Sequence, residues 1–256
     1  MDASKLIDLE GRVALVTGGS RGVGRATAEL LARAGAGVGI AYRSRDAEAQ
    51  EVVSTITAAG GSAWSRRGDL TDPDAVRALF EEAETRSGGV DIVVINHGVW
   101  PADGVPLAEM DPEQWRRTLR VNLDSALLVA REAARRMRPD GRLIFVGSTA
   151  GQRGEAMHAD YAASKGALIS VVKGLCVELA PEGITVNCVA PGWIDTEMAA
   201  PALAGEARAR VEGTIPLGRV ATADDIAGPI LFLSSRLGRH ITGEILNVNG
   251  GAVLVG

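Results

Sequence analysis

The sequence predicts an α/β protein with a doubly wound, seven-stranded parallel sheet and helices on both faces. Short apolar runs alternate with longer helical patterns along the 256 residues. The strand-like runs are continuous in Val, Ile and Leu, as in strands buried on both faces. No linker rich in Pro, Gly or Ser interrupts this alternation. We therefore expect a single domain over residues 1–256, whose least regular part is the segment at about 192–220.

Strands and helices are expected to follow one another in a regular order. The predicted strands are 12–17, 38–42, 62–69, 90–95, 141–148, 183–190 and 243–251. The predicted helices are about 22–33, 46–59, 71–86, 111–137, 160–180 and 223–235. Thr71 or Asp72 can cap the third helix, where Pro73 suits the first turn, and Asp111 with Pro112 begins the longest one in the same way. Helices that connect successive strands in this order make the strands parallel.

Charge and cysteine content argue against several classes of function. The formal net charge of -5 gives no support to binding of nucleic acid or of an anionic membrane. The N-terminus lacks the pattern of a signal peptide, and no apolar run is long enough to span a bilayer. Cys176 and Cys188 and the three histidines have no metal-ligand spacing, so we expect no metal. Two free thiols suit a reducing cytoplasm, where we expect the protein to reside.

A glycine-rich loop joins the first predicted strand to the first predicted helix. Gly18, Gly22 and Gly24 have G-x-x-x-G-x-G spacing. Glycine lets the backbone turn sharply and approach a pyrophosphate, which a helix N-terminus stabilises. A simple tight turn is the alternative reading, but the position at the first strand–helix junction favours dinucleotide binding.

The end of the second predicted strand bears on the choice of cofactor. An acidic residue there would bind the adenosine ribose of NAD(H). The stretch instead reads Tyr-Arg-Ser at 42–44, and the first acid is Asp46. Arg21, in the glycine loop, and Arg43 can bind a 2′-phosphate by charge-assisted hydrogen bonds. We therefore predict NADP(H) in preference to NAD(H); the alternative is that Arg43 and Arg45 are merely solvated.

Together with other segments, these features resemble the short-chain dehydrogenase/reductase family from about Gly11 to Gly251, and most closely its 3-oxoacyl-carrier-protein reductases. The segments are TGGSRGVG (17–24), GDLTD (68–72), INHG (95–98), RVNL (120–123), GSTAG (147–151), YAASK (161–165), PGWIDT (191–196) and ITGEILNVNGG (241–251). Ile95 and His97 depart from the family's N-N-A-G. The resemblance implies a Rossmann-type fold with a mobile substrate lid at about 192–220.

The resemblance also implies four catalytic residues. Tyr161 would be the general acid in ketone reduction and the base in alcohol oxidation. Lys165, one helical turn later, would favour the tyrosinate and hold the nicotinamide ribose. Ser148 would bind the substrate oxygen, and Asn122 would position a water for proton relay. The expected cofactor contacts are Gly18, Ser20, Arg21, Gly22, Val23, Gly24, Tyr42, Arg43, Ser44, Asp69, Leu70, Asn96, Gly98, Tyr161, Lys165, Pro191, Gly192, Ile194 and Thr196.

Substrate contacts are harder to predict. His97, Trp100, His158 and Trp193 neighbour the matched segments and are candidates for the substrate pocket. Each also has a structural reading, as a hydrogen-bonded histidine or as an aromatic in the core or an interface.

The predicted reaction is NADPH-dependent reduction of a ketone, either a β-ketoacyl thioester or a small carbonyl compound, to a secondary alcohol. One alternative is NAD(P)-dependent oxidation of a secondary alcohol, sugar or steroid. Another is a non-catalytic NADP-sensing protein, which the intact catalytic set argues against. Arg135, Arg136 and Arg138 could bind an acidic acyl carrier protein, or could be a solvated helix end. Apolar faces on the helices at 111–137 and 160–180 suggest a partner subunit. The resemblance implies that these helices pair across a dimer axis, and from it we expect a homotetramer.

Overall fold

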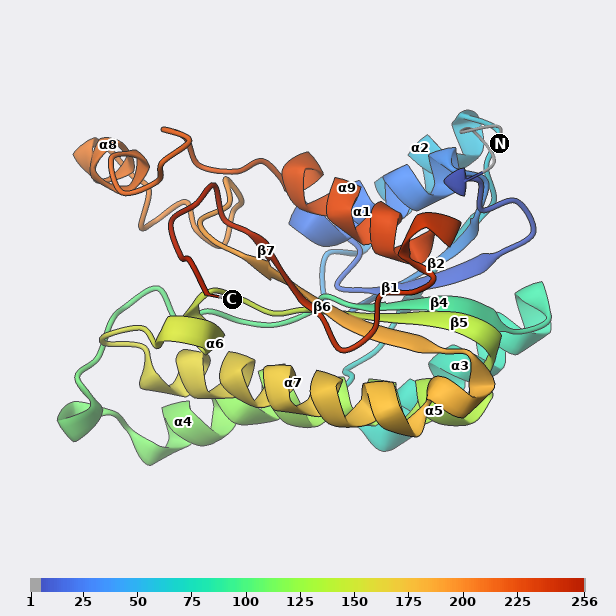
Figure 1. Ribbon diagram of the computed structural model, residues 1–256, viewed down its shortest axis with the longest axis horizontal. Helices are drawn as coiled ribbons and strands as arrows, with labels where there is room; N and C mark the ends of the chain where they lie inside the picture. The colour runs from blue at the N-terminus through green and yellow to red at the C-terminus, as the bar shows by residue number, and fades with distance from the viewer. Residues whose placement is uncertain (1–5, 256) are drawn as a thin grey trace.

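The computed structural model describes residues 6–255 and has one parallel sheet at its centre (Figure 1). The seven strands lie in the order β3-β2-β1-β4-β5-β6-β7. Their bounds are β1 Val13–Thr17, β2 Gly37–Tyr42, β3 Ala63–Arg67, β4 Val90–Ile95, β5 Met137–Val146, β6 Thr185–Pro191 and β7 Ile245–Val248. Every neighbouring pair is parallel, which confirms the predicted doubly wound, Rossmann-type α/β fold.

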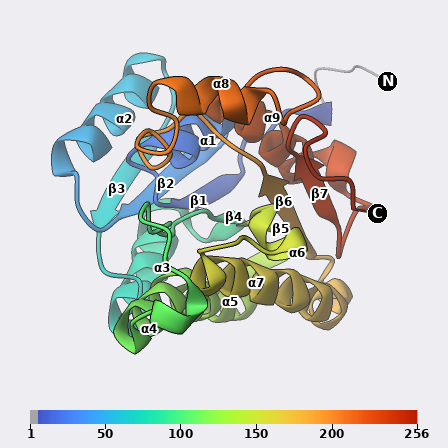
Figure 2. The same cartoon turned by 90° about the vertical axis from the view of Figure 1, so that its left-hand side faces the viewer.

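Helices cover both faces of the sheet, as Figures 1 and 2 show. One layer contains α1 (Gly22–Arg33), α2 (Asp46–Ala58) and α9 (Ala223–Ser234), which pack on one buried apolar cluster. The other layer contains α3 (Pro73–Ser87), α5 (Ser125–Arg136) and α7 (Ala159–Glu178), which pack on a second cluster. The strands separate the two clusters, and this explains why the strand sequences are apolar on both faces.

The predicted helix at 111–137 is interrupted, which corrects the sequence interpretation. It consists of α4 (Pro112–Leu119), a π-helical turn (Arg120–Asp124) and α5, and it ends where β5 begins at Met137. Apolar periodicity cannot distinguish an α-helical from a π-helical turn, because the two differ only in local hydrogen bonding. Such turns are frequent at functional sites, and this one contains Asn122.

Other predicted bounds are too long by a few residues. The strands expected at 62–69 and 243–251 extend only over Ala63–Arg67 and Ile245–Val248. The excess residues, at 62, 68–69, 243–244 and 249–251, lie in the loops before and after these two strands. Within residues 6–255, no helix combines the length and the apolar character that crossing a membrane requires.

The segment at 192–220 is mostly irregular but has a small core of its own. It contains α8 (Glu206–Glu212) and a buried group of four residues, Ala199, Leu203, Ile215 and Val220. Trp193 packs against this group. The segment lies on the same side of the sheet as α1 and α2 (Figure 2).

Candidate active site

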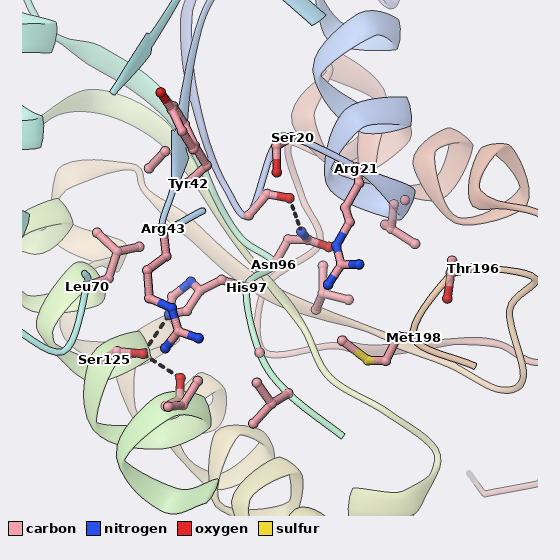
Figure 3. A pocket seen from close by; sticks show the side chains of 18 of the residues that line it. Ser20, Arg21, Tyr42, Arg43, Leu70, Asn96, His97, Ser125, Thr196 and Met198 are labelled. Atoms are coloured by element: carbon pink, nitrogen blue, oxygen red, sulfur yellow. Dashed lines mark hydrogen bonds between the residues drawn. The ribbon is translucent and has the colours of Figure 1, made fainter. Parts of the chain in front are cut away.

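A cavity of about 310 Å³ lies where the strand order reverses, between the carboxyl ends of β1 and β4. Its walls come from the segments that follow β1, β2, β3, β4, β5 and β6, and from the first turns of α7. The predicted site residues that line it are Gly18, Ser20, Arg21, Gly22, Val23, Tyr42, Arg43, Ser44, Asp69, Leu70, Asn96, His97, Gly98, Ser148, Tyr161, Lys165, Pro191, Gly192, Ile194 and Thr196. Figure 3 shows several of them around this space.

The glycine loop is packed so closely that side chains would not fit. Gly18 and Gly22 have positive φ angles of 65° and 53°. A Cβ on Gly24 would lie 2.2 Å from the carbonyl oxygen of Gly18 and 2.6 Å from Nδ2 of Asn96. Gly24 does not line the cavity, which corrects its prediction as a cofactor contact. It packs against Gly18 and Asn96 instead. Asn96 Nδ2 donates to the Thr17 carbonyl at 3.0 Å, which joins the loop to the end of β4.

The N-terminus of α1 is open toward the cavity. Its N-cap residue, Arg21, is extended and makes no side-chain capping hydrogen bond. The first amides of α1 therefore remain available to an anion, and the glycines leave room for its approach. These features fit the pyrophosphate of a dinucleotide.

Basic side chains gather at the adenosine end of the cavity. Arg21, Arg43 and Arg45 all line it. In Figure 3, Arg21 and Arg43 extend into this space from opposite walls. Asp46, the first acid after β2, accepts a hydrogen bond from Tyr42 Oη at 3.2 Å and does not line the cavity. The end of β2 therefore presents guanidinium groups where an NAD-binding site would present a carboxylate.

Asp69 is fixed in place at the same end. Its Oδ1 accepts hydrogen bonds from the Thr71 amide at 3.0 Å and from Thr71 Oγ1 at 2.8 Å. The backbone hydrogen bond from Thr71 lowers the pKa of the Asp69 carboxyl below its usual value. Asp69 is therefore an ionised acceptor at neutral pH.

Ser148, Tyr161 and Lys165 face the same cavity from two elements. Ser148 follows β5, and the other two are one turn apart on α7. Lys165 Nζ lies 5.9 Å from the centre of the Tyr161 ring and donates to the Val146 carbonyl at 2.9 Å. The arrangement brings a hydroxyl donor, a phenol and an ammonium group to one wall.

Burial shifts the pKa values of both Tyr161 and Lys165. Burial raises the pKa of Tyr161 to about 12, although hydrogen bonding with Ser148 opposes the rise. Burial lowers the pKa of Lys165 to about 8. Loss of solvation is the largest cause of both shifts, and the lowering of the tyrosine pKa by the ammonium stays a prediction. At neutral pH the protonated phenol suits a general acid.

Asn122 lies behind the cavity wall rather than on it. It is 1% exposed and sits in the π-helical turn. Its Oδ1 accepts from the Val99 amide at 2.7 Å, and its Nδ2 donates to the Val99 carbonyl at 2.9 Å and to Ser164 Oγ at 3.1 Å. Asn122 thus fixes the loop after β4 against α7.

His97 lines the cavity, but both of its ring nitrogens already have partners. Ser125 Oγ donates to the Val121 carbonyl at 2.6 Å and so accepts from His97 Nε2, also at 2.6 Å. His97 Nδ1 lies 2.7 Å from Thr17 Oγ1, a hydroxyl whose one proton serves either this nitrogen or the Val94 carbonyl at 3.2 Å. Burial and nearby Lys165 lower the histidine pKa to about 4, so the ring is neutral at pH 7. The ring joins β1, β4 and α5 and has no ring nitrogen free for substrate. Figure 3 shows its contact with Ser125.

The other predicted substrate residues form one aromatic cluster. Trp100 stacks on His158 with ring centres 4.8 Å apart, and Trp193 meets Trp100 edge-on at 5.8 Å. They come from three loops: the one after β4, the turn before α7, and the one after β6. None lines the 310 Å³ cavity, and Trp100 lines an adjoining hollow of about 380 Å³.

The sequence interpretation missed several cavity residues. The added ones include Arg45, Thr71, Val99, Val121, Ser125, Glu197 and Met198. The sequence predicts Arg45 only as a solvated residue. Glu197 and Met198 directly follow the matched PGWIDT segment, and Ser125 lies three residues after Asn122, so proximity in sequence was the available signal. Within residues 6–255, no group of three or more His, Cys, Asp or Glu side chains is arranged to hold a metal ion.

Comparisons with known proteins agree with this geometry. A family model described as Enoyl-(Acyl carrier protein) reductase matches residues 18–253. The 3-oxoacyl-[acyl-carrier-protein] reductase FabG of Escherichia coli (strain K12) is 40% identical over 252 residues, which are 97% of this chain and 100% of that protein. A dehydrogenase/reductase from Sinorhizobium meliloti 1021 superposes with a TM-score of 0.93 at 38% identity, covering 98% of both chains. A short chain dehydrogenase from Burkholderia cenocepacia J2315 in complex with NADP superposes with a TM-score of 0.90 at 39% sequence identity. The match covers 95% of this chain and 98% of that one.

Proposed function

Because this chain belongs to the short-chain dehydrogenase/reductase family of NAD(P)-dependent oxidoreductases, we propose that it uses NADPH to reduce a ketone to a secondary alcohol. The observation that carries the proposal is the convergence of Ser148, Tyr161 and Lys165 on the cavity that the glycine loop also lines. The open α1 terminus and the close-packed glycines fit the dinucleotide at the other end. The proposed substrate is a β-ketoacyl thioester or a small carbonyl compound.

The proposed roles follow from the charges of the wall. When bound, the reduced nicotinamide supplies the hydride. Ser148 donates a hydrogen bond to the carbonyl oxygen and stabilises the negative charge that develops there. Tyr161, protonated because its pKa is raised to about 12, transfers its proton to that oxygen. The Lys165 ammonium stabilises the tyrosinate that remains, and the phenol is then reprotonated from solvent. Asn122 positions the Val99 loop and the water of this relay.

Preference for NADPH over NADH is supported by the guanidiniums around the adenosine end. Arg21 and Arg43 would bind the 2′-phosphate, with Tyr42 and Ser44 beside them. Asp46, which is engaged by Tyr42, is not placed to compete.

We further propose that the segment at about 192–220 is the substrate lid and that the aromatic cluster is the wall it closes on. Trp193 belongs to the lid and touches both the lid's own core and Trp100. His158, which is 9% exposed, stacks its ring on that of Trp100. Substrate would therefore be selected by its fit to apolar, aromatic surfaces next to Tyr161.

Use of an acyl carrier protein has less support than the use of a free substrate. Arg135 and Arg136 both pair with Glu132, at 2.9 and 3.1 Å, and Arg138 pairs with Asp91 at 2.9 Å. Arginines whose charges are already neutralised attract an acidic partner weakly. We propose a cytoplasmic homotetramer that acts on free thioesters or ketones.

The test is NADPH consumption with one β-ketoacyl group presented as a small thioester and on acyl carrier protein. We expect turnover of the small thioester, with a similar kcat/KM for the two forms. A much higher kcat/KM with the carrier would show that the carrier is recognised. Absence of turnover with both, and with a panel of free ketones, would refute the proposed reaction.

A further inference from the structure

A carboxylate on the proposed lid contacts two arginines of the cofactor loops. Glu197 Oε2 accepts from Arg21 Nη1 at 2.6 Å and from Arg45 Nη2 at 3.0 Å. The two arginines are 176 and 152 residues from Glu197 in sequence, so only the fold brings them together. All three residues line the mouth of the 310 Å³ cavity.

This arrangement resembles the binding of a phosphate oxygen. A single oxygen atom accepts from guanidiniums on two loops, one after β1 and one between β2 and α2. Arginine forks bind phosphate and carboxylate oxygens by the same charge-assisted hydrogen bonds. Glu197 therefore occupies guanidinium groups at the place where the 2′-phosphate of NADPH is proposed to bind.

The contact between the lid and the two arginines is exposed to solvent, and Arg45 has a second partner besides Glu197. Arg45 also pairs with Glu48 at 2.8 Å, and its backbone is left-handed, with φ 77°, immediately before α2. The side chains of Arg21, Arg45 and Glu197 are 43%, 46% and 57% exposed. Ion pairs this exposed contribute little to stability, so a doubly charged phosphate can replace the carboxylate.

Arg43 provides a first contact for that phosphate. It lines the cavity and is not among the arginines that form ion pairs in the described part of the chain. A phosphate can bind Arg43 first and then replace Glu197 as the hydrogen-bond partner of Arg21 and Arg45.

We infer that Glu197 is a specificity-determining residue that competes with the 2′-phosphate of NADPH for Arg21 and Arg45. The inference rests on the proposed use of NADPH. Binding of NADPH displaces Glu197 and frees the start of the lid, whereas NADH, which lacks the phosphate, leaves the contact intact. Removing the charge of Glu197 should therefore favour NADPH selectively.

The experiment is a direct titration of NADPH and NADH into the wild type and into Glu197→Gln, without substrate. We expect the Kd for NADPH to fall about two- to fivefold and the Kd for NADH to stay unchanged. The control is Glu206→Gln, which removes the same charge from the same lid. The Glu206 side chain is 96% exposed, and within residues 6–255 it pairs only with Arg210, at 3.8 Å, so its replacement should change neither Kd.

Other outcomes would overturn the inference. An equal fall in the Kd values for NADPH and NADH would indicate only a general effect of the Glu197 charge on the pyrophosphate. Weaker or unchanged NADPH binding would show that Glu197 does not compete with the phosphate. The same titrations with 2′,5′-ADP and 5′-AMP separate the effect of the 2′-phosphate from that of the nicotinamide. In Glu197→Gln, only 2′,5′-ADP should bind more tightly than it does to the wild type. If the wild type bound neither cofactor, the proposed function itself would fail.

Discussion

Tyr161 and Lys165 show how burial sets the chemistry of single residues at this site. Loss of solvation favours the neutral form of each group, which raises the tyrosine pKa to about 12 and lowers the lysine pKa to about 8. The raised pKa of Tyr161 leaves it a proton donor at neutral pH. They also place the loss of the Lys165 charge within reach of a pH titration.

Activity should therefore decline in alkaline solution. Lys165 is an ammonium below about pH 8 and loses its proton above it, whereas Tyr161 remains protonated throughout. The kcat/KM for NADPH at saturating ketone reports ionisations of the cofactor-free enzyme. We expect it to be level near pH 7 and to fall above pH 8 by about tenfold per pH unit. A level profile up to pH 10 would contradict the assigned role of Lys165.

Sequence reasoning identified most residues of the cavity but not how they are used. Motif spacing pointed to Ser148, Tyr161 and Lys165, and all three line one wall. Motif spacing could not show that both ring nitrogens of His97 contact Thr17 and Ser125, because these partners lie on other elements. Side-chain partners of this kind depend on tertiary packing.

The glycine loop and α1 form the element on which the proposed cofactor site depends most. A Cβ on Gly24 would lie 2.2 Å from a backbone oxygen, a distance that only backbone movement can relieve. Gly24→Ala should lower the free energy of unfolding by about 1–3 kcal/mol. It should also weaken NADPH binding about tenfold or more, since the loop above it must shift. Urea unfolding and cofactor titration would measure the two effects.

The matched control is Gly228→Ala in α9. A Cβ there meets nothing within 4 Å. Alanine in this helix should leave stability unchanged or raise it by up to about 1 kcal/mol, with no effect on NADPH binding. Equal losses of stability and of NADPH affinity in the two variants would contradict the close-packing argument for Gly24.

At the level of elements, the sequence predicted seven parallel strands but not the interruption of the long helix. Continuous Val and Ile runs mark buried strands such as β4, where all six residues are buried. The π-helical turn at Arg120–Asp124 leaves no comparable trace, because the apolar stripe continues across it. Its effect is to place Asn122 against the Val99 backbone.

Apolar residues are exposed on the outer surfaces of α5 and α7. Val177 on α7 is 72% exposed and Leu127 on α5 is 37% exposed. Such residues are common in interfaces between identical subunits. We expect light scattering to give a mass near four times the 26.6 kDa of one chain. A mass of a single chain would contradict the proposed tetramer.

Contacts between distant parts of the chain are what the sequence could least reveal. The link between Glu197 and Arg21 spans 176 residues and joins the proposed lid to the glycine loop. Neither residue is unusual in its local sequence. The fold family, by contrast, followed from the order of several motifs and is confirmed.

The central claim is that Tyr161 donates the proton in an NADPH-dependent ketone reduction. The most direct measurement compares turnover and NADPH binding in Tyr161→Phe, with a β-ketoacyl thioester that the wild type reduces. Phenylalanine keeps the ring but removes the acidic proton, so turnover should fall by about 10²–10⁴-fold. The Kd for NADPH should change little. Near-normal turnover with intact NADPH binding would contradict the account.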